Sequence, residues 1–382
     1  MPGSGPGHIK SVERRKVRGR RNAVAVLACV ATFLLAACGG ASSSSGSAAA
    51  NLNDATRKLV DAARAEGALD MNGVFNGGAT EAQALIDGFN QRYGLHSSIK
   101  YTPYASGPDE VAKLIAERQA SQPPHTDMFL GPTDFIRQLS DAGTVVPLQM
   151  PDPTALDSKW LTQSGGVAIP FYTIFPGIAY NTNLVKGTEV PSTYADLLKL
   201  NVPLAGTPYA AGYLTLASPA VWGPEKAIAY ATAYAKKMAG LGGCGNEAQI
   251  ASGQYAILAP DCAENFVQIL KNKGAPIGYV IPKDAPLIYW FWGAVLKGCA
   301  HPNTAQLFIN YLATSGAQKI FYKYDLTDLD LLPGSHTGQE RRAYEAKGYK
   351  FYVSDFDFLA ANNPQALPAY AKIIQIMTTK QG

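Results

Sequence analysis

The sequence predicts an α/β fold with two domains. Helical and strand patterns alternate through 54–143, and a second alternating series runs through 176–282. Strands separated by single helices are typical of parallel sheets with helices on both faces. Residues 1–37 have the pattern of an export signal. Without them 382 − 37 = 345 residues remain, which is enough for two domains with cores of their own.

The first series begins with a helix expected at 54–66. Asp54 is its candidate N-terminal cap, Gly67 its candidate terminator, and Thr80 the candidate cap of the next helix. Apolar spacing then predicts strands and helices in turn. The strands are expected at 68–76, 98–104 and 126–130, and the helices at 80–94, 108–120 and 133–143.

The second series follows the same alternation. Its strands are expected at 176–182, 254–260 and 276–282, and its helices at 224–240 and 264–274. The stretch LIYWFWGAVLK at 287–297 is expected to form one more strand. Alternation along this strand places Tyr289 and Phe291 on one face and Trp290 and Trp292 on the other.

The N-terminal segment has the pattern of an export signal. A basic region containing paired arginines precedes the apolar run at 23–37, which is shorter than the roughly 20 residues that cross a membrane. LAAC at 35–38 resembles the lipobox of bacterial lipoproteins, in which cleavage precedes a lipidated cysteine. We therefore expect a signal peptide at 1–37, a lipid on Cys38 and a flexible tether at 38–52. The general and twin-arginine export routes both stay open.

The charge of the chain is concentrated in this leader. The leader carries seven basic residues and one acidic residue, so the net charge of +4 becomes 4 − 6 = −2 in the mature chain. No basic patch remains, which excludes nucleic acid as a partner.

The mature chain has three cysteines besides Cys38, namely Cys244, Cys262 and Cys299. Outside the cytoplasm, three cysteines favour one disulfide and one free thiol. Nearness in sequence favours the pair Cys244 and Cys262, while the other two pairings stay open.

Four polar turns contain the candidate ligand-binding residues. They are FNGGATE at 75–81, GPTD at 131–134, TPYAAGY at 207–213 and PDCAEN at 260–265. Ligands of open α/β sheets bind beyond the carboxyl ends of strands, where helix N-termini present backbone N–H groups. One such turn alone is usually an ordinary helix cap, whereas four in one cleft would form a site. The candidates are Asn76, Gly78, Thr80, Thr133, Thr207, Gly212 and Glu264.

The segments at 59–94, 177–198, 250–258 and 294–318 resemble, in the same order, segments of the ferric-type solute-binding proteins of bacterial ABC importers. The resemblance covers most of 55–320 and weakens beyond it. It implies a two-lobed type II periplasmic-binding-protein fold with a ligand cleft between the lobes. One lobe would comprise 53–168 plus 295–382, and the other 169–294.

Bare ferric ion fits this sequence less well than an organic solute. Ferric-binding relatives hold iron with a histidine, a glutamate and a tyrosine pair, because hard iron needs anionic oxygen donors. The matching positions here fall near Ala79, Pro132 and the stretch at 262–265. The tyrosine pair is missing, and only Glu264 could supply charge.

An aromatic wall is expected to replace the iron ligands. One face of the 287–297 strand could line the cleft through Trp292, joined by Tyr172 and Tyr209. Aromatic side chains opposite helix N-termini would suit a small organic molecule with an anionic group. A ferric ion or ferric chelate is the alternative ligand.

Enzyme motifs are weak in this sequence. Ser97 and Lys100 have the S-x-x-K spacing of penicillin-recognising enzymes, but they fall in an expected strand and no Lys-Thr-Gly accompanies them. The aspartates at 325, 328 and 330 do not complete a calcium loop, and the histidines lack metal-ligand spacing.

We therefore expect a monomeric, lipid-anchored receptor without catalytic activity or cofactor. It would bind a small molecule and pass it to a membrane permease, whose partner ATPase hydrolyses ATP. A tethered extracellular enzyme on the same fold is the alternative of another class.

Overall fold

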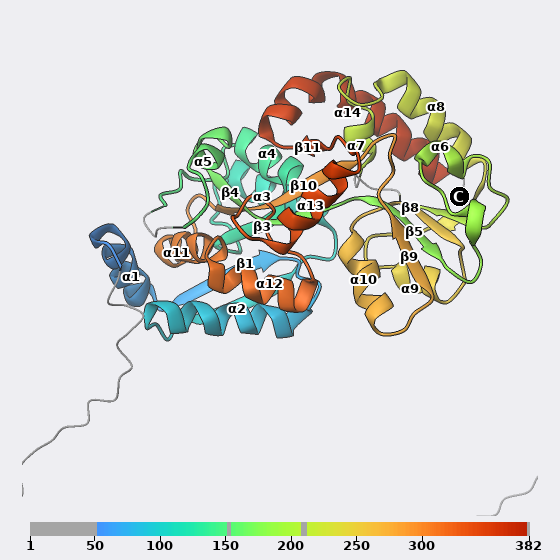
Figure 1. The fold of residues 1–382 in the computed structure, drawn as a ribbon. Coiled ribbons are helices and arrows are strands. Elements are labelled where there is room, and N and C mark those ends of the chain that lie inside the picture. Colours follow the sequence, from blue (N-terminus) through green and yellow to red (C-terminus); the bar gives the residue numbers. More distant parts are fainter. Residues whose placement is uncertain (1–51, 151–153, 208–211, 380–382) are drawn as a thin grey trace, which may run out of the picture. The chain divides into compact units, whose positions relative to one another are not determined.

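The computed structural model describes residues 52–150, 154–207 and 212–379. These residues belong to one compact unit, and their ribbon is coloured along the sequence in Figure 1. The predicted signal peptide, Cys38, most of the predicted tether and Tyr209 lie outside the described residues. Leu52, the last residue of the predicted tether, is buried in the core.

The first sheet has six strands in the order β11-β10-β3-β1-β2, with β4 paired to β10. β1 pairs in parallel with β2 and β3, whereas β10 runs antiparallel to β3 and β4. The strands are β1 (Ala68–Gly73), β2 (Ser98–Pro103), β3 (Met128–Pro132), β4 (Ala168–Ile174), β10 (Leu287–Val295) and β11 (Tyr352–Ser354).

The second sheet has five strands in the order β7-β6-β8-β5-β9. β6 pairs in parallel with β7 and β8, and β5 is antiparallel to β8 and β9. The strands are β5 (Gly177–Asn181), β6 (Leu204–Gly206), β7 (Met238–Leu241), β8 (Ile257–Asp261) and β9 (Ile277–Val280).

Both sheets are therefore mixed, and the prediction of parallel sheets is wrong at β5 and β10. The reason is that β4 leads directly into β5 of the other sheet, and β10 later returns to the first sheet from β9 without an intervening helix. The boundaries predicted at 168/169 and 294/295 fall within β4 and within β10, and both strands belong to the first sheet.

Helices pack around the two sheets, and those predicted at 54–66, 80–94, 108–120, 133–143, 224–240 and 264–274 are present with ends shifted by up to five residues. Those of the first half are α1 (Asp54–Glu66), α2 (Gly78–Tyr93), α3 (Gly107–Gln119), α4 (Thr133–Asp141), α5 (Lys159–Gln163), α6 (Tyr194–Leu197) and the 3₁₀ turn η2 (Gly187–Glu189). The later ones are α7 (Tyr213–Leu216), α8 (Pro224–Ala235), α9 (Glu247–Ala251), α10 (Glu264–Asn272), α11 (Pro302–Leu312), α12 (Ser315–Asp325), α13 (His336–Ala346) and α14 (Phe356–Thr379).

Two predicted caps differ from the structure. α1 is capped by Asn53, whose Oδ1 accepts a hydrogen bond from the backbone N–H of Thr56 at 2.8 Å, and Asp54 is the first helical residue. α2 begins at Gly78, so Thr80 lies inside the helix and is exposed.

The apolar interior divides between the two sheets. The first core contains Met71, Phe129 and Phe308, and the second contains Leu204, Tyr213 and Ile373. Ile373 lies on α14, which packs against α7 and α8 beside the second sheet, as Figure 1 shows. The C-terminal helix thus covers the second sheet, although the sequence predicted that it belongs to the first lobe. Among the described residues, no helix is both long and apolar enough to span a membrane.

Candidate functional site

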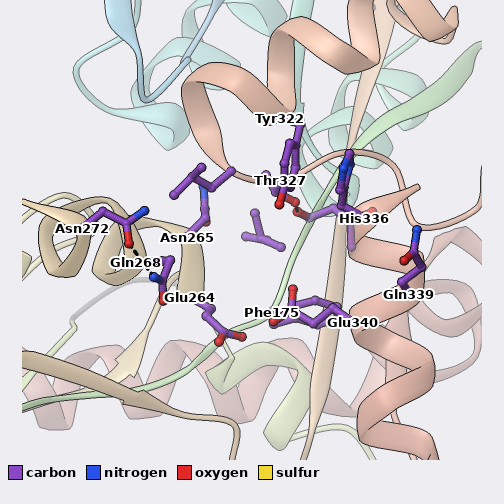
Figure 2. A pocket seen from close by; sticks show the side chains of 13 residues that line it. Phe175, Glu264, Asn265, Gln268, Asn272, Tyr322, Thr327, His336, Gln339 and Glu340 are labelled. Carbon is purple, nitrogen blue, oxygen red and sulfur yellow. Dashed lines mark hydrogen bonds between the residues drawn. The ribbon is translucent and has the colours of Figure 1, made fainter. Parts of the chain in front are cut away.

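A cavity of about 490 Å³ lies where elements of the two sheets meet. Its wall combines the end of β4, helix α10 of the second sheet, the C-terminal end of α12 and the first turns of α13 (Figure 2). The volume falls in the range of pockets that hold small organic molecules.

Two carboxyl groups line this cavity, Glu264 at the start of α10 and Glu340 on α13. Burial and, to a smaller extent, the negative charge of Glu340 together raise the pKa of Glu264 to about 8. Burial also raises the pKa of Glu340. The two groups can share a proton, because neighbouring carboxylates resist ionising together.

The remaining wall is polar and aromatic. His336 and Tyr322 stack with ring centroids 3.5 Å apart and planes inclined by 9°. The Nδ1 atom of His336 lies 3.1 Å from Oδ2 of Asp328, which also accepts the backbone N–H of His336. The imidazole, which lies beside Tyr322 in Figure 2, is therefore held by its neighbours in the wall of the cavity.

A hydrogen-bond network next to the cavity joins two of the predicted turns. The side-chain amides of Asn76 and Asn265 both donate to the hydroxyl oxygen of Tyr172, at 2.9 and 3.0 Å. Nδ2 of Asn265 also donates to the backbone carbonyl of Asp325 at 3.0 Å. Asn265 lines the cavity, so this network fixes part of its wall.

The backbone N–H groups at the start of α2 already have anionic partners within the chain. The N–H of Gly77 donates to Oδ1 of Asp325 and to Oε2 of Glu81, both at 3.0 Å, and the N–H of Asn76 lies 3.4 Å from Oδ2 of Asp325. These carboxyl groups satisfy the positive helix N-terminus. The prediction that this turn holds a ligand anion therefore has no support in the structure.

Gly78 is needed for its backbone conformation. Its φ is +59°, and a Cβ atom built at this position would meet no heavy atom within 4 Å. The predicted close approach of a ligand to Gly78 is thus replaced by a left-handed turn that favours glycine.

Thr133 and Trp292 lie in the core. The Trp292 indole Nε1 donates to Oγ1 of Thr133 at 3.0 Å, and Thr133 donates to the carbonyl of Ser354 at 2.7 Å. Trp292 is fully buried and contacts Trp290 and Phe356 edge to face. The prediction of Trp292 in the cleft is wrong, because both faces of β10 are covered.

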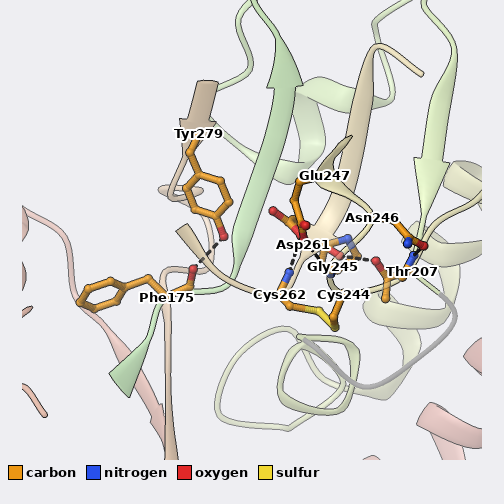
Figure 3. The surroundings of a disulfide bond; sticks show 11 residues. Phe175, Thr207, Cys244, Gly245, Asn246, Glu247, Asp261, Cys262 and Tyr279 are labelled. Atoms are coloured by element: carbon orange, nitrogen blue, oxygen red, sulfur yellow. Dashed lines mark hydrogen bonds between the residues drawn. A yellow bond between two sulfur atoms is a disulfide. The ribbon is translucent and has the colours of Figure 1, made fainter. Parts of the chain in front are cut away.

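The third predicted turn is also held internally. Thr207 donates from its hydroxyl to the carbonyl of Pro260 at 2.7 Å, and Gly212, with φ of +102°, precedes the four-residue helix α7. Nearby, Cys244 and Cys262 form a disulfide with Cα atoms 5.4 Å apart, the pairing that the sequence favours (Figure 3). Cys299 is a free thiol.

Of the predicted site residues, Glu264 alone among those described lines the cavity, and Asn76 and Tyr172 reach its wall through Asn265. Sequence reasoning missed Tyr322, His336 and Glu340, which follow the region of resemblance. The signal that could have found them is the spacing of His336, Gln339 and Glu340, which places three polar side chains on one face of a helix. Within the described residues, no group of three or more His, Cys, Asp or Glu side chains could hold a metal ion.

Solved structures share this architecture. The periplasmic binding protein MotA from A. tumefaciens B6, in complex with glucopine, is 17% identical over 81% of this chain and 99% of its own, with a TM-score of 0.63. AfuA from Actinobacillus pleuropneumoniae, with fructose-6-phosphate bound, is 18% identical over 81% and 98%, with a TM-score of 0.65. The ferric binding protein from Campylobacter jejuni is 17% identical over 80% and 99%, with a TM-score of 0.61.

At these identities the similarity establishes the fold, the two-sheet α/β architecture of periplasmic binding proteins. No curated protein sequence matches the chain. A family model described as bacterial extracellular solute-binding protein matches residues 84–346. Since this match spans more than half of the chain, the protein belongs to the family of bacterial extracellular solute-binding proteins.

Proposed function

We propose that the chain captures one small organic solute in the cavity between α10, α12 and α13 and delivers it to the permease of an ABC importer. The observation that carries this proposal is the cavity itself, because its wall combines α10 from the second sheet with β4 from the first. A solute that contacts both parts stabilises the arrangement in which they lie together, and a permease can recognise that arrangement.

The type of solute follows from the cavity and not from the α2 turn. Similar folds hold an opine and a sugar phosphate, and a ferric binding protein shares the fold too. In this chain the anionic group expected from the sequence would have to displace Asp325 from the N–H groups of Asn76 and Gly77. Ferric ion would find one predicted ligand, Glu264, in the cavity wall. An uncharged or cationic organic solute fits the described wall better.

The lipid anchor on Cys38 is part of the proposal, and the basic leader, the short apolar run and the LAAC motif support it. Two acyl chains at about 0.8 kcal/mol per buried methylene would hold the receptor firmly at the membrane. Cys38→Ala should release the protein from the membrane fraction without changing its thermal unfolding. Retention of this variant at moderate salt contradicts the anchor.

Native mass spectrometry of gently purified protein tests the receptor function. We expect a retained solute of defined mass that is recovered chemically unchanged after incubation with the protein. Conversion of this solute by the purified protein contradicts the proposal and favours the alternative, a tethered enzyme on the same fold.

A further inference from the structure

Three pairs of neighbouring carboxyl groups occur in the described residues. They are Glu81 with Asp325, Glu247 with Asp261, and Glu264 with Glu340. Burial raises the pKa of Glu81, Asp261 and Glu264. In each case the negative charge of the other carboxyl group in the pair also raises it. Such pairs hold a proton because two adjacent negative charges repel each other.

Backbone donors stabilise two of these pairs within the fold. The N–H of Gly77 donates to both Glu81 and Asp325. Beside the disulfide, the N–H of Gly245 donates to Oε1 of Glu247 at 3.0 Å, and the N–H of Cys262 donates to Oδ1 of Asp261 at 2.8 Å (Figure 3). These donors give both pairs a structural role, and neither pair lines the cavity.

The pair Glu264 and Glu340 differs in both respects. Both side chains line the cavity in Figure 2. Oε1 of Glu264 meets the hydroxyl of Tyr344 at 3.5 Å, and Oε2 of Glu264 is buried without a hydrogen-bond partner in the described part of the chain. A buried carboxyl oxygen without a donor is costly. Glu81 and Asp261 each have one such oxygen too, but a backbone N–H reaches their other oxygen, whereas Glu264 has no backbone donor among the described residues and faces the cavity.

A second unpartnered acceptor lies in the same wall. The side-chain nitrogen of Asn265 donates to the carbonyl of Asp325, which can only accept, so the orientation of the amide is fixed. Its Oδ1 is consequently an acceptor, and it is buried without a partner among the described residues. Glu264 and Asn265 thus each have one buried oxygen without a hydrogen-bond donor among the described residues.

The cavity wall has no strongly cationic side chain of its own that could donate hydrogen bonds to Glu264 and Asn265. Among the described residues that line the cavity, none is a lysine or an arginine. Lys271 on α10 acts only weakly on Glu264, and Arg341 on α13 is paired with Asp330 at 2.7 Å and Glu345 at 2.9 Å. Phe175 and Tyr322 supply aromatic surface, which also attracts cations.

We infer that the cavity selects a solute with a protonated nitrogen, an ammonium or guanidinium group, for which Glu264 and Glu340 are the counter-ions. This inference rests on the proposed receptor function and names its class of solute. The N–H groups of the cation take the place of the shared proton, and Asn265 accepts from another donor of the same molecule. Binding therefore ionises Glu264 and releases its proton to solvent.

Matched pairs of small probes test the sign of the charge. Butane-1,4-diamine is compared with adipate, and 2-phenylethylamine with 3-phenylpropionate, by isothermal titration and by thermal shift of the mature protein. We expect the amines to bind and the carboxylates to have no effect. Glu340→Gln should weaken amine binding by at least about tenfold, as loss of a desolvated charge partner does. Glu345→Gln, on the same helix but outside the cavity, should bind as wild type.

The pH dependence of amine binding separates a role in binding from a purely structural role of Glu264 and Glu340, because a purely structural role would leave the amine affinity independent of proton release. The ionisable groups that face Glu264 are Glu340, Tyr344, Tyr279 and Lys271, and Asp328 and His336 lie next to Glu340. Because Glu264 must lose a proton below its pKa of about 8, amine affinity should rise up to about tenfold per pH unit between pH 6 and 8. Titrations in two buffers of different ionisation enthalpy should show proton release.

Three results would overturn the inference. The carboxylates bind in place of the amines, both amines fail to bind, or wild type and Glu340→Gln bind the amines with equal affinity. Glu340→Gln removes a like charge, so its thermal unfolding should not fall below that of wild type. An anionic solute retained unchanged in native mass spectrometry would overturn the inference but leave the receptor function standing. Chemical conversion of a retained amine would instead overturn the receptor function.

Discussion

Asn76 and Asn265 donate from their side chains to one oxygen, the hydroxyl of Tyr172, at 2.9 and 3.0 Å. Asn76 precedes α2 beside the first sheet, whereas Asn265 lies on α10, which packs against β9 of the second sheet. Tyr172 is on β4, shortly before the chain enters the second sheet. One hydroxyl group thus joins segments of both sheets at the wall of the cavity.

Tyr172→Phe should lower the free energy of unfolding by about 1–3 kcal/mol. The half-buried amide of Asn76 and the buried amide of Asn265 would both lose this hydrogen-bond acceptor, and loss of hydrogen bonds at a buried polar group costs this amount. Urea unfolding monitored by tryptophan fluorescence measures the change. Tyr352→Phe on β11 is the control, because its hydroxyl has no hydrogen bond to the described residues. Equal stability of Tyr172→Phe and wild type would show that the network does not stabilise the fold.

Gly78→Ala should lower stability by about 1 kcal/mol, and Gly78→Val by more, because side chains with a Cβ disfavour φ of +59°. The affinity for the solute should stay near that of wild type, since Gly78 does not line the cavity. Gly94→Ala, at φ of +60° after the same helix, should cost a similar amount. Selective loss of binding in a stable Gly78→Ala protein would restore the ligand contact predicted from the sequence.

Thr133→Val should destabilise the protein by about 1–3 kcal/mol without changing solute affinity. Valine keeps the shape but removes the acceptor of the Trp292 indole N–H and the donor to Ser354. Chemical unfolding and titration with the retained solute separate the two effects. Thr80→Val, at an exposed position of α2, should change stability by less than about 0.5 kcal/mol.

Stability should fall as the pH rises from about 5 to 9 in the absence of solute. Burial raises the pKa of Glu81 to about 10 and that of Glu264 to about 8, well above the ordinary glutamate value of 4.5. The folded protein therefore keeps protons that the unfolded chain releases above pH 4.5. Each group contributes a loss of at most about 1.4 kcal/mol per pH unit until its folded pKa is reached.

Glu81→Gln checks this dependence, because glutamine cannot release a proton. Between pH 6 and 9 its free energy of unfolding should fall less steeply with pH than that of wild type. Glu189→Gln, at an exposed position in η2, should keep the wild-type slope. A wild-type protein whose stability rises over this range would show that these carboxyl groups are ionised in the fold.

Local patterns in the sequence predicted six of the helices and seven of the strands in the described residues, and the disulfide. α1 and α10 begin at the predicted residues Asp54 and Glu264, although Asn53 caps α1 and no side chain caps α10. The direction of β10 could not be predicted in this way, since it depends on which sheet the strand joins. The same limit applies to the site. The carboxylate of Asp325 accepts hydrogen bonds from the N–H groups of Asn76 and Gly77. Because Asp325 is distant from them in sequence, only the folded structure shows that these donors already have acceptors.

The position of α14 has a consequence for the order in which the chain becomes stable. Met377 of this helix lies in the same core as Leu204 and Tyr213, and its sulfur accepts a hydrogen bond from the Tyr213 hydroxyl at 3.8 Å. Until a growing chain extends through α14, one wall of that core is missing and the apolar side chains of the core face water. Until α14 has been made, this half of the protein therefore exposes apolar surface that is prone to aggregate and that chaperones can bind.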